Sequence, residues 1–204
     1  MKLNEIESLP DRLKNNLKVR AIASGQTLFR RGDKATELYI IQSGYFKEIR
    51  YLKKSKIATL QMLSIGESLG ETSLIFDNYI STVVSQVNSE VIAYPIAILS
   101  EIILQYPDLL SGVLEMLCQK VSCLQDRLAW RDINPSQERI LQYLQHQAFS
   151  NSSEVIKLKF SLQEIAAELG FTPETLSRAF NKLEAAGTIT RRQNEIILRD
   201  FDAA

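Results

Sequence analysis

Three polar side chains near the C-terminus have the types and the spacing needed to read DNA bases. They are Glu174, Ser177 and Arg178, and residues three and four apart lie on one face of a helix. An Arg can donate two hydrogen bonds to guanine O6 and N7, a Glu can accept one from cytosine N4, and a Ser can serve either role. The spacing therefore predicts a base-reading helix face; the alternative is a solvated face with ordinary charges.

Two consecutive helices are predicted around these side chains. Ser161 and Glu164 have the spacing of a capping box, and Gly170 is placed to end the first helix in the left-handed conformation. Thr172 and Pro173 then begin a second helix, because Thr is a good N-cap and the missing N–H of Pro costs nothing in the first turn. A helix, a short turn with Gly and a second helix make a helix-turn-helix, whose second helix enters the major groove of DNA.

A pair of short strands follows the second helix. Residues 188–190 and 195–198 are β-prone, and a polar turn near Gln193 and Asn194 joins them into a wing. Basic residues in this region are expected to contact phosphates, which position a protein on DNA without reading its sequence. The predicted DNA-contacting residues are Thr172, Glu174, Thr175, Ser177, Arg178, Lys182, Arg191 and Arg192.

The N-terminal half has a different pattern. Short β-prone runs broken by turn residues fill residues 25–94, which predicts an antiparallel barrel or roll. Residues 1 to 20 are expected to be helical, and Lys53 to Lys56 to form the solvated tip of a hairpin. A helical pattern resumes over residues 97–105.

A long helix is predicted over residues 108–131. Its apolar residues recur at steps of three and four, which is the a/d pattern of a coiled coil. This narrow seam favours pairing with the same helix of a second subunit; packing on the helix's own domain is the alternative. The seam, and therefore the expected dimer interface, consists of Leu110, Leu114, Leu117, Val121, Leu124 and Leu128. The expected domains are a sensor (1–106), a dimerisation helix with a hinge (107–133) and a DNA-binding domain (134–204).

The composition is that of an ordinary globular chain. Its 204 residues are 45% hydrophobic and carry a formal net charge of zero, so any DNA affinity must come from the local placement of Lys and Arg. We find no apolar run near the roughly 20 residues of a membrane helix, no signal-peptide core and too few cysteines for a disulfide framework, and we expect a cytoplasmic protein. The sequence has no phosphate-binding loop and one His, which argues against an enzyme.

This arrangement resembles the CRP/FNR family of bacterial transcription regulators. The resemblance rests on the roll motif from Gly32 to Gly44, on residues 66–71 (Gly-Glu-Ser-Leu-Gly-Glu) and on residues 172–178 (Thr-Pro-Glu-Thr-Leu-Ser-Arg). It implies an α+β fold with an N-terminal antiparallel β-roll of the cyclic-nucleotide-binding type, a long dimerisation helix and a C-terminal winged helix-turn-helix. It also implies a homodimer that binds double-stranded DNA, contacts RNA polymerase and activates transcription.

The second helix is similar to that of the FNR branch of this family. The cyclic-AMP receptor branch usually has an Arg just before the Glu, where this chain has Pro173, which cannot read a base. Glu174, Ser177 and Arg178 match the Glu-x-x-Ser-Arg pattern of the FNR branch, which implies TTGAT-type half-sites. By position, Arg178 would contact guanine, Glu174 the opposing cytosine and Ser177 a thymine, in a TTGAT-N4-ATCAA-like palindrome.

The effector of the roll stays open. In members that bind cyclic AMP, a Glu after Gly holds the ribose, a role that Glu71 fits, and a downstream Arg-Ser pair holds the phosphate, where this chain has Ser81 and Thr82 without an Arg. A cyclic phosphate needs a fixed cation, so we expect no cyclic-AMP binding. An unidentified small molecule between the roll and the long helix and a constitutive regulator with a silent pocket fit equally well. The residues expected to line such a pocket are Gly70, Glu71, Thr72, Ser81 and Thr82.

Two resident cofactors of the family have few candidate ligands. An FNR-type iron–sulfur cluster needs N-terminal cysteines, and no cysteine precedes Cys118, so no cluster is expected. The single His146 lies in the DNA-binding domain, where we expect a surface residue, so only haem held by other ligands stays open. Cys118 and Cys123 are interpreted as small packing residues, with an intersubunit thiol reaction as the alternative. A rival function is an interaction module whose helix-turn-helix no longer binds DNA.

Overall fold

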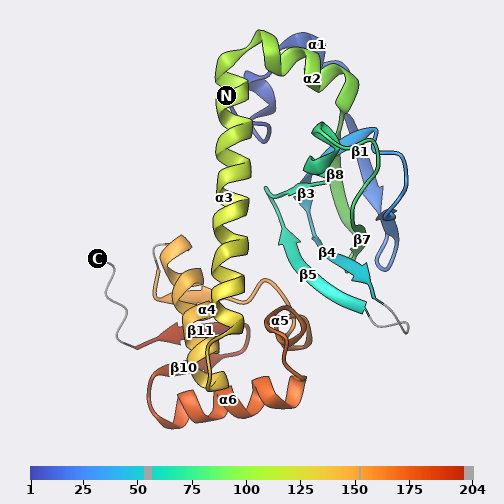
Figure 1. The fold of residues 1–204 in the computed structure, drawn as a ribbon. Helices are drawn as coiled ribbons and strands as arrows, with labels where there is room; N and C mark the ends of the chain where they lie inside the picture. The colour runs from blue at the N-terminus through green and yellow to red at the C-terminus, as the bar shows by residue number, and fades with distance from the viewer. Residues whose placement is uncertain (53–56, 152, 200–204) are drawn as a thin grey trace. The chain divides into compact units, whose positions relative to one another are not determined.

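The computed structural model describes residues 1–52, 57–151 and 153–199, and it divides into two compact units, Met1–Lys120 and Val121–Ala204 (Figure 1). The hairpin tip expected at Lys53 to Lys56 lies outside the described residues. One helix, α3 (Pro107–Arg131), contributes to both units because the division falls within it. Each unit has an apolar core of its own.

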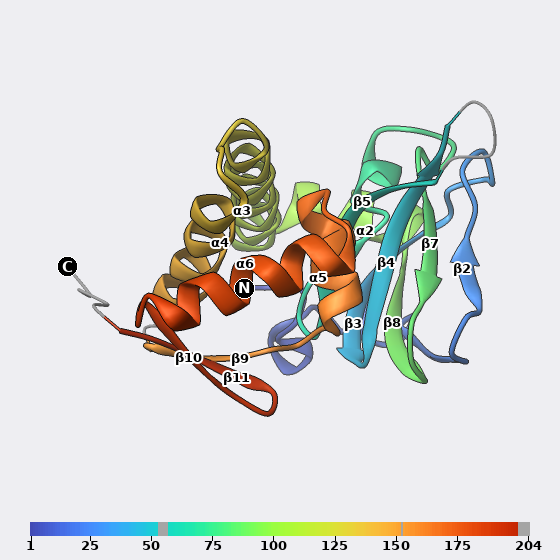
Figure 2. The same cartoon turned by 90° about the horizontal axis from the view of Figure 1, so that it is seen from below.

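Two four-stranded antiparallel sheets make up most of the first unit (Figures 1 and 2). One sheet has the strand order β1-β8-β3-β6 and the other has the order β2-β7-β4-β5, so strands distant in sequence become neighbours. This arrangement confirms the predicted antiparallel roll. The strands are β1 (Lys18–Ile22), β2 (Thr27–Phe29), β3 (Glu37–Ser43), β4 (Tyr45–Tyr51), β5 (Ile57–Ser64), β6 (Ser68–Leu69), β7 (Thr82–Ser85) and β8 (Ser89–Pro95).

The turn between β3 and β4 requires a glycine. Gly44 has a φ of 76°, in the left-handed region, and a Cβ built there would lie 2.1 Å from the Ser89 hydroxyl oxygen. Ser89 is held in turn by a 2.9 Å hydrogen bond from the Ser85 hydroxyl. Because Ser89 is buried and bonded, the turn can approach β8 this closely only without a side chain.

A stack of aromatic rings lies in the roll beside Gly70. The rings of Phe29 and Tyr79 are stacked with centroids 3.8 Å apart, and the centroid of the Tyr39 ring lies 5.9 Å from that of Phe29. The Tyr79 hydroxyl donates a 2.7 Å hydrogen bond to the carbonyl of Glu37. Burial raises the pKa of both Tyr39 and Tyr79 above the ordinary value for tyrosine.

The N-terminal segment corrects one prediction, because it is not a continuous helix to residue 20. Two short helices precede a strand, β1, that begins at Lys18. The apolar residues of the segment recur at helical steps of three and four, but Pro10, which has no backbone N–H, separates the two helices. Its leucines are buried beside helix α2. These buried residues are Leu3, Leu9 and Leu13. The helices are η1 (Ile6–Ser8), α1 (Asp11–Lys14) and α2 (Ile96–Gln105).

The long helix forms as predicted, with Pro107 in its first position. Leu109 and Val113 are buried in the core of the first unit, and Leu117 is half-buried against it. The other five seam residues are exposed, by 37% at Leu110 up to 62% at Leu128. In the described part of the chain no single helix is long and apolar enough to cross a membrane; α2 and α3 meet that test only together, across a bend of 117°.

The second unit combines three further helices with a three-stranded sheet of order β10-β11-β9. Strand β9 was not predicted, because three residues beside a polar loop give no periodic signal. It pairs with β11 through Ile156 and Ile196, and both side chains are buried. The elements are α4 (Ser136–Asn151), β9 (Val155–Lys157), α5 (Leu162–Leu169), α6 (Pro173–Ala185), β10 (Ile189–Arg192) and β11 (Glu195–Leu198).

Candidate nucleic-acid interface

Helix α5 begins and ends as its sequence predicts. The Glu164 backbone N–H donates to the Ser161 hydroxyl at 3.3 Å, and the Ser161 backbone N–H donates to the Glu164 carboxylate at 2.8 Å, which completes the capping box. Gly170 follows the helix with a φ of 73°. Ile165, Ala166 and Leu169 are buried, so α5 is fixed against the rest of the second unit.

Helix α6 is capped just as locally. The Thr172 hydroxyl accepts a 3.2 Å hydrogen bond from the Thr175 backbone N–H, and Pro173 occupies the first turn. One side of the helix is buried in the core of the unit; its residues are Leu176, Ala179, Phe180 and Leu183. Anchoring on that side leaves the opposite side as a rigid, outward-facing surface.

The predicted base-reading residues lie together on this outward side of α6. Glu174, Ser177 and Arg178 are all exposed. The Arg178 Nε donates a 3.3 Å hydrogen bond to the backbone carbonyl of Glu174, one turn earlier. The helix thus presents a carboxylate, a hydroxyl and a guanidinium within its first two turns. We call these three residues the reading face.

The charge of Glu174 is stabilised by its place at the start of α6. Its own backbone N–H, the Thr172 hydroxyl and the positive charge of Arg178 together hold the pKa of this carboxyl below its ordinary value. An ionised carboxylate is an acceptor only, so it can pair with a donor such as cytosine N4 but with no acceptor.

The three residues predicted to contact phosphates fall into two groups. Lys182 at the end of α6 and Arg192 at the end of β10 are exposed. Arg191 instead pairs with Glu184 at 2.7 Å and donates to the Asn181 side-chain oxygen at 2.6 Å. The hydrogen bonds from Arg191 also lower the pKa of Glu184. Arg191 therefore joins the wing to α6, and its charge is largely offset within the unit.

One residue that positions the helix-turn-helix was missed in the sequence. Arg139 on α4 donates to the carbonyls of Arg131 at 2.7 Å, Ile133 at 3.0 Å and Leu169 at 3.2 Å. Its guanidinium also lies 4.7 Å from the centre of the Phe171 ring. Arg139 thus satisfies carbonyls at the ends of both α3 and α5, and no sequence motif signals that role.

The last turns of α3 carry two further contacts of the second unit. Arg127 pairs at 2.5 Å with Glu168 of α5, whose side chain is 3% exposed. His146 was expected at the surface, but it is half-buried against Trp130 and lies 3.2 Å from the carboxylate of Asp126. Cys118 and Cys123, interpreted as packing residues, are both exposed on α3.

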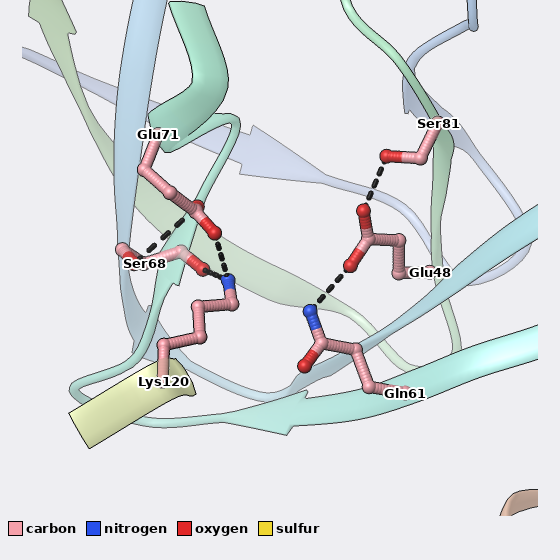
Figure 3. A network of polar contacts seen from close by, with 6 residues as sticks. All are labelled: Glu48, Gln61, Ser68, Glu71, Ser81 and Lys120. Atoms are coloured by element: carbon pink, nitrogen blue, oxygen red, sulfur yellow. Dashed lines mark hydrogen bonds and ion pairs between the residues drawn. The ribbon is translucent and has the colours of Figure 1, made fainter. Parts of the chain in front are cut away.

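The residues expected to line an effector pocket are engaged with other protein groups (Figure 3). The Glu71 carboxylate pairs with the Lys120 ammonium of α3 and accepts a 3.4 Å hydrogen bond from the Ser68 hydroxyl. The Ser81 hydroxyl donates to the carboxylate of Glu48. In the described residues, no group of His, Cys, Asp and Glu side chains could hold a metal ion.

The other residues expected to line an effector pocket are Gly70, Thr72 and Thr82, and they belong to the local backbone structure. Gly70, with a φ of 73°, starts the short helix η3 (Glu71–Leu74), and a Cβ there would lie 2.8 Å from the Tyr79 ring. Thr72 is half-buried within η3. The Thr82 hydroxyl accepts a 3.0 Å hydrogen bond from the Arg31 backbone N–H.

Comparisons with known proteins agree with both halves of this description. Residues 19–106 match the family of the cyclic nucleotide-binding domain, and residues 138–203 match the Crp-like helix-turn-helix domain. The transcriptional regulatory protein btr of Bordetella pertussis is 25% identical over 206 residues, which cover 98% of this chain and 84% of that protein. The nitrogen fixation regulation protein FixK of Bradyrhizobium diazoefficiens is 26% identical over 183 residues, covering 87% and 76%.

The fold itself is shared with a solved structure. A CooA mutant from Carboxydothermus hydrogenoformans superposes with a TM-score of 0.80 and 17% sequence identity, over 98% of this chain and 91% of that one. At this identity the likeness concerns the fold alone.

Proposed function

Because the chain belongs to the CRP/FNR family of DNA-binding transcription regulators, we propose that it recognises a palindrome of TTGAT-like half-sites. The observation that carries this proposal is the reading face of α6. Its three side chains are exposed on a helix that is capped at Thr172 and buried along its other side. A helix held in this way can enter a major groove without losing its own packing.

Each reading residue has a base that suits its chemistry. Arg178 can donate two hydrogen bonds to guanine O6 and N7, and Glu174, ionised at neutral pH, can accept from N4 of the paired cytosine. Ser177 lies between them in sequence and would contact a thymine. Lys182 and Arg192 are exposed and suited to phosphates, whereas we no longer assign that role to Arg191.

A homodimer is part of the proposal. Five residues of the leucine seam are exposed on α3, and pairing with the same helix of a second copy would cover them. Two copies related by a two-fold axis would present two reading faces to the two halves of a palindrome. The family resemblance further suggests activation through contact with RNA polymerase, in the bacterial cytoplasm where the chromosome lies.

Selection of binding sites from random duplex DNA tests the base assignment. We expect the purified protein to enrich TTGAT separated by four base pairs from its inverted repeat. Arg178→Ala should lose the preference for the guanine position, whereas Arg30→Ala, which removes an exposed Arg from the first unit, should enrich the same motif as the parent. An enriched motif without this half-site would refute the assignment.

A second measurement separates the dimer from the base assignment. Sedimentation equilibrium should give twice the mass of the chain, and Leu124→Lys in the exposed seam should shift the protein to a monomer with much weaker palindrome binding. A parent protein that sediments as a monomer on the palindrome would contradict the dimer. A transcription assay with RNA polymerase and a promoter that carries the selected site then tests activation.

A further inference from the structure

The interior of the roll contains a second polar cluster beside the Glu71–Lys120 pair (Figure 3). The two carboxylate oxygens of Glu48 on β4 accept hydrogen bonds, one from the Ser81 hydroxyl and the other from the Gln61 side-chain amide. Both donors are buried, with 4% and 6% of their surfaces exposed. By the family resemblance, Ser81 lies in the stretch where cyclic-AMP-binding members place a cation. In this chain it is bonded to an anion instead.

The Lys120–Glu71 pair is also enclosed. Their side chains are only 16% and 12% exposed, and the Lys120 ammonium donates a second hydrogen bond, of 3.0 Å, to the Ser68 carbonyl. A buried charge is tolerated when it is paired and hydrogen-bonded, and two of the three ammonium donors are used in this way. The ammonium is therefore bound by the roll as a ligand would be, although it belongs to α3.

The charges of the whole cluster disfavour an anionic effector. Among the six residues drawn in Figure 3, Glu48 and Glu71 are carboxylates and Lys120 is the single cation, so the cluster is negative overall. A cyclic phosphate brought here would meet like charge and would have to displace the ammonium from its carboxylate.

We propose that Lys120 is a built-in occupant of the roll, and that its ammonium joins α3 to Glu71 and Ser68 in place of a small-molecule effector. DNA binding then needs no added ligand. This inference rests on the proposed DNA-binding function and concerns how that function is regulated. It favours a constitutive regulator with a silent pocket, in which the protein itself supplies the bridging cation. A ligand can shift an equilibrium between two conformations of a protein only if it binds one of them more tightly than the other. The same holds for a tethered group such as the Lys120 ammonium.

The position of Lys120 on α3 suits this role. Arg127 lies one heptad further along, two turns away on the same face of the helix, and pairs with Glu168 of the helix-turn-helix. One continuous helix thus carries a cation bound by the roll and, seven residues later, a cation bound by α5. Loss of the Lys120 contact with the roll is expected to alter the contact between Arg127 and Glu168.

Equilibrium DNA binding of the full chain, with no small molecule added, tests the assignment. The probe is a fluorescent duplex with the TTGAT-N4-ATCAA palindrome. We expect tight binding by the parent protein and binding about tenfold weaker for Lys120→Met and for Glu71→Gln, within the usual range of coupling between sites. Lys120→Arg, which keeps the charge, should restore most of the affinity. Glu115→Gln breaks an exposed ion pair of the same helix with Lys2 and should stay within about twofold of the parent.

A chemical rescue separates a bound cation from general damage to the fold. Lys120→Ala should bind n-propylammonium, which replaces the three carbons and the ammonium that the substitution removes, in calorimetry and recover DNA affinity with it, whereas tetramethylammonium, which has no N–H donor, should do neither. The chain has one tryptophan, Trp130, and it lies in the second unit. Because the proposal couples Lys120 to the second unit through α3, the emission of Trp130 should change in Lys120→Met and match that of the parent in Lys120→Arg. A variant that is merely misfolded would show no such recovery.

The outcomes separate the two proposals. Lys120→Met that binds the palindrome like the parent, or a parent whose affinity rises tenfold on addition of cyclic AMP, would overturn the built-in occupant. A parent that binds every duplex equally would instead defeat the reading-face assignment. In that case, propylammonium binding and Trp130 emission in the Lys120 variants would still decide the role of Lys120.

Discussion

The reading face of α6 and the interior of the roll contain the same three kinds of side chain. Glu174, Ser177 and Arg178 supply a carboxylate, a hydroxyl and a cation on an exposed helix surface. Glu71, Ser68 and Lys120 supply the same groups in the roll, where they are bonded to one another. Residue type therefore sets only what a group can bind, and burial decides whether that capacity is used inside the protein or on a partner.

This difference separates effects on folding from effects on binding. Removing one member of an enclosed pair leaves its partner buried without an opposite charge, which lowers the free energy of unfolding. Removing a group from an open face leaves the fold intact and weakens only the interaction with a ligand. Paired variants in the two kinds of region can test this distinction.

The largest effect is expected at an enclosed pair. Glu168→Gln leaves Arg127 without its carboxylate partner in the second unit. We expect a loss of about 3 kcal/mol in the free energy of unfolding, which is the lower end of the usual cost of breaking a buried ion pair. Urea denaturation followed by Trp130 emission measures it. Glu138→Gln on exposed α4 surface is the matched control, and an equal midpoint for both variants would contradict the distinction.

A smaller effect, confined to binding, is expected on the open face. Arg178→Ala should lose about 1–3 kcal/mol of binding free energy on the palindrome and relax selectivity at one position. Its thermal midpoint should match that of the parent, because the side chain is exposed. A large drop in the midpoint would show that Arg178 supports the fold instead.

Lys182 and Arg191 sharpen the comparison within one domain. Lys182→Ala should weaken binding to all DNA sequences and reduce the slope of log affinity against log salt by about 1. Arg191→Ala should leave that slope nearly unchanged and lower stability, because Arg191 is bonded to Glu184 and Asn181. Affinities measured over a range of salt concentrations distinguish the two, and a matching slope change in Arg191→Ala would return it to the phosphate-contacting set.

The smallest expected effect is on pH. Because the pKa of Glu174 is lowered, its carboxylate should stay ionised as the pH falls into the ordinary range of Glu, and the associated stabilisation should disappear only as the pH drops through the lowered pKa. An NMR titration of the side chain checks this, with the ordinary Glu pKa of 4.5 as the reference. A Glu174 midpoint at or above the reference would contradict the predicted stabilisation by the helix start.

Local signals in the sequence predict the helix-turn-helix well. The capping residues Ser161 and Thr172 act on backbone groups only three residues away, so the sequence alone indicates where both helices begin. The seam of α3 is similarly periodic and local. The roll could be predicted as a class because its strands recur at regular spacing, although the pairing order of those strands could not.

Contacts between distant residues are where sequence reasoning fails. Lys120 pairs with a residue 49 positions away, and Arg139 bonds to a carbonyl 30 positions away. Neither contact has a spacing that a pattern could detect. For the same reason the sequence predicts that Arg191 is available to phosphates, since the nearby Glu184 and Asn181 become its partners only when β10 folds back along α6.

The ring stack beside Gly70 makes the roll vulnerable to alkali. Tyr39 and Tyr79 lose their protons less readily in the folded protein than at the ordinary tyrosine pKa of 10.0. The stabilisation is complete below that pH and declines above it, because the unfolded chain then releases protons that the native roll retains. Phenolate absorbance from these two rings should therefore appear together with unfolding, and earlier ionisation of a native protein would mean that water reaches the stack.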